Sequence, residues 1–139
     1  MIASMIPHAG TMCLLDEVLR WDAVAIRCLS RRFRQADNPL RHSDGTLGAA
    51  CSIELAAQAI AVHGRLIAAD DTPSTRGYLA SLRDVSLASV KLDRLADDLV
   101  VDAELLMGDH RSAAYRFEVA AEGRVLASGR ATVLLEVRA

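Results

Sequence analysis

Aromatic residues are scarce in this chain, at 4% of its 139 residues. Hydrophobic residues nevertheless make up 52%, so a core can form, and it must be built from Ala, Val, Leu and Ile. These small side chains favour close packing of a helix against a sheet. The length predicts one domain that spans residues 1–139.

Several other absences argue against whole classes of protein. No apolar run reaches the ~18 residues that a membrane span needs, and residues 1–12 lack the pattern of a signal peptide. The net charge is −2 without a basic block, so nucleic acid is not an expected partner. The three cysteines, Cys13, Cys28 and Cys51, show no CxxC spacing, which predicts free thiols and a cytoplasmic location. Ligand spacings for a metal and motifs for a cofactor are also missing, so neither is expected.

One long helix is predicted over residues 45–69, where Ala, Leu and Ile are abundant and Pro is absent. Ser43 or Asp44 could cap its start. Its apolar residues fall on two flanks, which are separated by a narrow polar stripe of Glu54, Gln58 and Arg65. A helix that is apolar on both flanks is one around which other elements wrap.

Alternating patterns predict strands over residues 24–33, 77–87, 99–106, 113–121 and 125–137. Short connections join the last three, so these should pair antiparallel. The order predicts an α+β hotdog fold, with an antiparallel sheet of about five or six strands wrapped around one long central helix. The alternative is an α+β sandwich with the helix on one face.

Glu54 is the first candidate for chemistry, because it lies midway along the apolar helix. A buried carboxylate is costly unless it is paired, and burial suits it to general acid or base work. Gln58 lies one turn further and can hydrogen-bond Glu54. The alternatives are a Glu that pairs with an Arg at the helix edge and a surface amide.

The loop before the helix offers two further candidates. His42 could shuttle protons beside the helix start, or it could simply be exposed. Gly48 has no side chain, so backbone N–H groups near it could polarise a thioester carbonyl as an oxyanion hole does. Cys51, one turn before Glu54, is more consistent with a small buried thiol than with a nucleophile.

Two stretches resemble one known family. Residues 6–18, Ile-Pro-His-Ala-Gly-Thr-Met-Cys-Leu-Leu-Asp-Glu-Val, are similar to the N-terminal motif of hotdog 3-hydroxyacyl-[acyl carrier protein] dehydratases. Residues 53–59, Ile-Glu-Leu-Ala-Ala-Gln-Ala, are similar to the helix motif of the same family. Their order and separation also fit, so the resemblance covers nearly the whole chain.

The resemblance implies dehydration of 3-hydroxyacyl thioesters, carried by acyl carrier protein or coenzyme A, to 2-enoyl thioesters. In that family the helix carboxylate and a loop His form the active pair across a dimer interface. The resemblance therefore gives Glu54 the acid role, Gln58 a supporting role and Gly48 a place near the oxyanion site.

The loop departs from the family pattern, whose His lies fourteen residues before the Glu. That position is Leu40 here, and matching the Pro-containing stretch instead places Asn38 there; His42 is two residues out of register. The segment is more similar to divergent dehydratase-like proteins of aryl-polyene and related fatty-acid-like pathways. We therefore expect a homodimer, or a heterodimer in which a weak or silent subunit partners an active dehydratase. An acyl thioesterase on the same fold is a third hypothesis.

Overall fold

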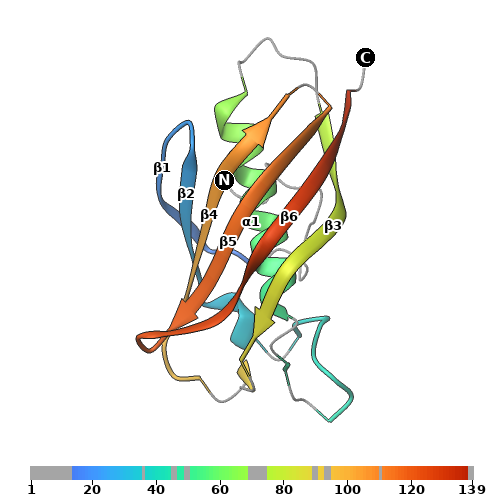
Figure 1. Cartoon of the computed structure of the whole chain (residues 1–139). Coiled ribbons are helices and arrows are strands. Elements are labelled where there is room, and N and C mark those ends of the chain that lie inside the picture. The colour runs from blue at the N-terminus through green and yellow to red at the C-terminus, as the bar shows by residue number, and fades with distance from the viewer. Residues whose placement is uncertain are drawn as a thin grey trace.

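The computed structural model describes residues 14–35, 37–44, 47, 48, 51–68, 75–88, 91, 92, 95–109 and 111–137. In chain order the elements are β1 (Glu17–Trp21), β2 (Ala25–Ser30), the 3-10 helix η3 (Arg32–Arg34), α1 (Cys51–Ile67), β3 (Thr75–Leu87), β4 (Leu99–Gly108), β5 (Ser112–Ala121) and β6 (Arg124–Val137). The six strands form one antiparallel sheet in the order β1-β2-β4-β5-β6-β3. Figure 1 shows α1 lying along one face of this curled sheet. The predicted α+β arrangement, one sheet around one helix, is confirmed.

The last three strands follow the predicted alternation closely. In β5, Tyr115, Phe117 and Val119 are buried, while Arg116 and Glu118 between them are exposed. Phe117 lies opposite Gly129 of β6 in the ladder. A Cβ atom added to Gly129 would come within 3.0 Å of the Phe117 ring. The missing side chain at Gly129 therefore makes room for the Phe117 ring.

Tight turns connect the strands where the sequence supplies suitable residues. Glu122 and Gly123 join β5 to β6 with φ angles of 55° and 71°, as a type I′ hairpin turn requires at both central positions. Between β1 and β2, Asp22 Oδ1 accepts hydrogen bonds from the N–H groups of Val24 and Ala25, both at 2.8 Å. These backbone donors lower the pKa of Asp22 below its usual value.

The helix is shorter than predicted, because α1 begins at Cys51 rather than near residue 45. Leu47 is fully buried, and its carbonyl accepts a 2.8 Å hydrogen bond from Leu92 N–H. This long-range bond ties the segment to another loop and leaves Leu47 and Gly48 outside the helix. Ser43 and Asp44 therefore cannot cap α1, and the prediction that they do is wrong. No helix in the described part of the chain combines the length and apolar character that crossing a bilayer requires.

The first strands also differ from expectation. The strand predicted over residues 24–33 ends at Ser30, and the chain turns into η3. The cause is Asp16, whose carboxylate accepts hydrogen bonds from the backbone N–H groups of Arg31 and Arg32. Strand β1 was not predicted, because only Val18 of its five residues is even half-buried and no alternation shows.

Candidate functional site

A chain of polar groups links the N-terminal segment to the helix carboxylate. Gln58 is fully buried on α1, and its Oε1 atom accepts a 2.9 Å hydrogen bond from Leu14 N–H. Because a backbone N–H can only donate, the Gln58 amide must turn its NH2 group toward Glu54, and it donates to Glu54 Oε1 at 3.1 Å. The predicted hydrogen bond between Gln58 and Glu54 is thus present, and the alternative of a surface amide is wrong.

Glu54 is half-buried and lies in the first turn of α1, not midway along the helix. The difference follows from the later start of the helix. The partial positive charge at a helix N-terminus favours a carboxylate in this turn. Beside it lies a narrow apolar pocket between α1 and β3, whose lining includes Ile53, Ala57, Leu79 and Leu82. A carboxylate and an apolar slot therefore occupy neighbouring positions of one helix.

Asn38 is buried next to Cys51, the first residue of α1, and only 4% of its surface is exposed. Its amide NH2 donates to the Phe33 carbonyl at 2.9 Å and contacts Cys51 Sγ at 4.0 Å, while its carbonyl accepts from Leu40 N–H at 2.9 Å. The amide therefore organises its own loop. Burial raises the pKa of the Cys51 thiol to about 11, so this thiol stays protonated at neutral pH and is a poor nucleophile.

His42, the loop histidine predicted to take part in the chemistry, lies beside Gly48. It is exposed, and a Cβ atom placed on Gly48 would lie 3.6 Å from His42 Nε2. The structure therefore brings these two predicted residues together next to the backbone that leads into α1. Within the described residues, His42 makes no hydrogen bond or ion pair with Glu54. A catalytic pair of His42 and Glu54 stays a prediction.

Sequence reasoning missed the backbone and loop contacts that hold these side chains. Arg41 Nε donates to the Gln35 carbonyl at 2.9 Å, and its Nη2 atom donates to the Arg34 carbonyl at 2.5 Å. Arg41 thus fastens the loop that carries Asn38 and His42. No signal in the sequence distinguishes this arginine from the others nearby.

His63 is fully buried on α1, and its hydrogen-bond partners are Tyr115 and Asp22 rather than Glu54. Its Nε2 atom lies 2.8 Å from the Asp22 carbonyl, which can only accept, so Nε2 carries the hydrogen. Its Nδ1 atom then accepts from the Tyr115 hydroxyl at 2.6 Å. Burial raises the pKa of Tyr115 to about 12, which keeps that donor protonated. His8, His110 and Cys13 lie outside the described residues, and within those residues no cluster of His, Cys, Asp and Glu could hold a metal ion.

The sheet around one helix, with a carboxylate and an amide on that helix beside an apolar slot, defines a protein of the hotdog-fold dehydratase and thioesterase class. The chain belongs to the ApeP-like dehydratase family, because the family model described as ApeP dehydratase matches residues 1–137. This confirms the resemblance to dehydratase-like hotdog proteins. No curated protein matches the chain significantly.

Solved structures support the same fold. A chain of the dehydratase heterocomplex ApeI:P from Xenorhabdus doucetiae has a TM-score of 0.83 at 24% identity, covering 99% of this chain and 91% of that one. A mutant thioesterase from Pseudomonas aeruginosa has a TM-score of 0.64 at 10% identity, covering 88% and 81%. A hypothetical thioesterase with coenzyme A from Streptococcus pneumoniae has a TM-score of 0.62 at 14% identity, covering 88% and 86%.

Proposed function

We propose that this chain is a dehydratase subunit that converts 3-hydroxyacyl thioesters, bound to acyl carrier protein or coenzyme A, into 2-enoyl thioesters and water. The observation that carries the proposal is the oriented Glu54–Gln58 pair on α1, in a chain of the ApeP-like dehydratase family. The Glu54–Gln58 pair suits the polar end of the substrate, and the apolar lining of the slot is of the kind that an acyl chain would contact, although the slot of about 10 Å³ is too small to hold a chain without opening.

The proposed reaction needs no cofactor, because it is an elimination that requires only one proton removed from the carbon next to the thioester carbonyl and one proton given to the leaving hydroxyl oxygen. A base removes the proton next to the thioester carbonyl, the double bond forms, and the hydroxyl leaves with a proton as water. Glu54 is the proposed proton donor to the hydroxyl, held in place by Gln58. His42 is the proposed base, and backbone N–H groups near Gly48 polarise the carbonyl oxygen. Asn38 supports the loop that carries His42.

A partner subunit is part of the proposal. Strand β3 forms an edge of the sheet, and four of its apolar side chains are 40–45% exposed: Leu79, Leu82, Val85 and Leu87. An exposed apolar edge strand favours pairing with another chain. The partner can be a second copy or a related dehydratase, and the similarity to a chain of the ApeI:P heterocomplex favours the related dehydratase. An aryl-polyene or related fatty-acid-like pathway is the setting we propose.

The alternative function is a catalytically silent subunit that supports an active partner. It is favoured by the altered loop, in which Leu40 stands fourteen residues before Glu54, where the dehydratase family has its His. An acyl thioesterase rests on fold similarity alone and ranks third.

One set of assays separates the three functions. The pure chain is incubated with 3-hydroxyacyl and 2-enoyl thioesters, alone and with a co-expressed dehydratase, and free thiol release is followed in parallel. We expect interconversion that Glu54→Gln abolishes while the variant keeps its fold and its partner. Turnover only in the mixture, unchanged by Glu54→Gln, would establish the silent subunit. Thiol release without interconversion would establish the thioesterase.

A further inference from the structure

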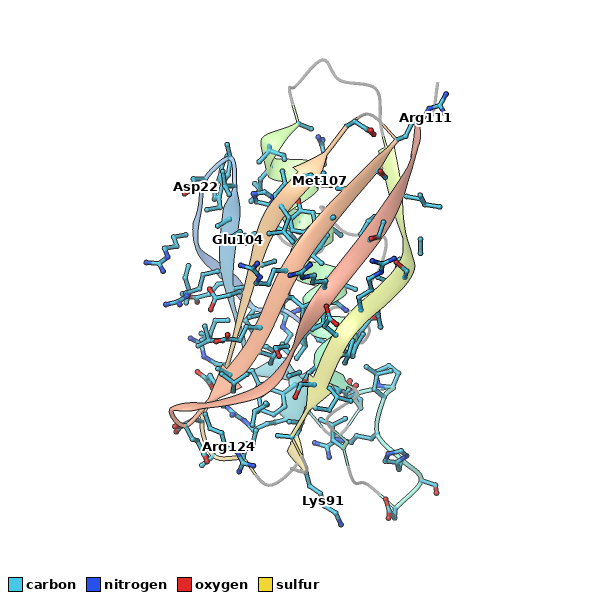
Figure 2. All side chains as sticks on the ribbon, viewed as in Figure 1. Asp22, Lys91, Glu104, Met107, Arg111 and Arg124 are labelled. Atoms are coloured by element: carbon cyan, nitrogen blue, oxygen red, sulfur yellow. The ribbon has the colours of Figure 1, made fainter. Side chains whose placement is uncertain are left out.

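The face of the sheet that points away from α1 carries a second, larger concavity. It has a volume of about 540 Å³ and crosses β2, β4, β5 and β6. Its walls are charged side chains such as Glu104, Arg116 and Arg130, which alternate along the strands with residues buried against α1. Figure 2 shows Glu104 at the middle of the sheet, on β4. The volume lies within the range of clefts that bind small ligands, about 300–1,000 Å³.

Three arginines lie in one row across this face of the sheet, and two of them, Arg116 and Arg130, line the concavity. In the strand register Arg116 of β5 faces Arg130 of β6, and Arg130 faces Arg83 of β3. Like charges in directly opposed positions of a sheet destabilise it. Arg116 is compensated by Glu104 at 3.2 Å. Arg130 and Arg83 make no ion pair or hydrogen bond through their side chains within the described residues, so their charges are left without direct compensation.

Five carboxylates line the concavity and have to be weighed against the arginines: Asp22, Asp84, Asp102, Glu104 and Glu118. Glu118 lies opposite Asp102 and Ser128 in the adjacent row of the sheet. Asp84 lies at the irregularity of β3, with a φ of 53°. Both line the concavity, and neither forms an ion pair with Arg130 or Arg83. Because five carboxylates and four arginines line the concavity, the guanidinium donors of Arg130 and Arg83, which no carboxylate of the described residues occupies, favour an anion there, and an excess of positive charge does not.

We propose that Arg83, Arg130 and Arg116 form a binding site for a phosphate-type anion on the outer face of the sheet. Guanidinium groups present paired N–H donors whose geometry matches phosphate oxygens. A dianion between Arg130 and Arg83 removes the like-charge repulsion that the strand register imposes. Ser128, next to Arg130 on the same wall, supplies a hydroxyl donor. The site lies across the sheet from Glu54 and is independent of the proposed dehydration.

Binding is measured by calorimetry and by thermal shift with inorganic phosphate and pyrophosphate, at constant ionic strength set with chloride. Saturable binding to the wild type is expected, with affinity reduced roughly tenfold or more in Arg130→Gln and in Arg83→Gln, since a charged hydrogen bond contributes about that factor. Glu118→Gln should bind more tightly, because it removes an opposing charge. Arg124→Gln is the matched control. Arg124 is an exposed arginine at the start of β6, the strand that carries Arg130, and Figure 2 shows it well away from Glu104. The affinity of this variant for phosphate should equal that of the wild type.

The source of the phosphate is distinguished in a second pair of measurements. Adenosine 3′,5′-bisphosphate tests a small phosphate ester, and phosphatidylglycerol vesicles test a lipid headgroup, each against Arg130→Gln. Lack of saturable binding of phosphate and pyrophosphate, or equal affinity in wild type, Arg130→Gln and Arg124→Gln, would overturn the proposal. All these side chains are exposed, so circular dichroism should show that each variant keeps the fold.

Discussion

Replacing Gln58 with Leu tests whether its amide fastens the N-terminal segment to α1. Gln58 is fully buried, and it accepts from Leu14 N–H and donates to Glu54. The variant leaves a buried N–H group at Leu14 without this acceptor, which costs about 1–3 kcal/mol, and it removes the bond to Glu54, which contributes about 1 kcal/mol. The apolar side chain offsets part of this loss. We expect the free energy of unfolding to fall by about 2 kcal/mol.

The assay is urea unfolding followed by circular dichroism, with the midpoint and the slope fitted separately. A lower midpoint at unchanged slope means lost native stability. Arg65→Gln, at an exposed position of the same helix, is the control and should be neutral. In a Glu54→Ala background the effect of Gln58→Leu should shrink by the coupling between the two side chains, about 1 kcal/mol. If Gln58→Leu is as stable as the wild type, the link from Leu14 to Glu54 contributes nothing and the reasoning fails.

Two further predictions concern the buried interior. Ser52 Oγ is buried and has no hydrogen-bond partner among the residues that the structure describes, so Ser52→Ala should raise the free energy of unfolding by about 1 kcal/mol. A clear loss of stability in urea unfolding would show that the hydroxyl is bonded in solution. Burial raises the pKa of Cys28 to about 12 and that of Cys51 to about 11. Because both values lie above the usual thiol value of 9.0, stability should be unaffected below pH 9 and fall as the pH rises toward 11. Cys51→Ala should flatten this fall, and an unchanged slope between pH 9 and 11 would contradict the assignment.

The regions predicted best from the sequence are those in which neighbouring residues decide the structure. The strand predicted over residues 113–121 corresponds to β5, because alternation and the Glu122–Gly123 turn are both local signals. Strand β1 was missed because it is an edge strand with a register shift between Val18 and Arg20, so its two faces are hardly distinguished. The helix start was misplaced because the bond between Leu92 N–H and the Leu47 carbonyl decides it, and no local pattern reports such a contact.

The same division applies to the candidate site. The hydrogen bond between Glu54 and Gln58 follows from their spacing of one helical turn, and the sequence predicts it. The anchoring of Gln58 by Leu14 spans 44 positions, and the contacts of the Asn38 amide depend on the path of its own loop. Such contacts could not be predicted, because tertiary folding creates them.

The surroundings of Glu54 therefore depend on residues outside this helix as well as on Gln58. Gln58 fixes one carboxylate oxygen from within the chain, whereas His42 lies beside Gly48 without bonding Glu54. Leu79 and Leu82 border the same slot and are 45% and 40% exposed, which is a large apolar exposure for residues that line a pocket. A single neighbouring subunit can cover these leucines beside the helix that carries Glu54. We therefore expect the identity of that subunit, rather than further rearrangement of this chain, to determine whether the site is active.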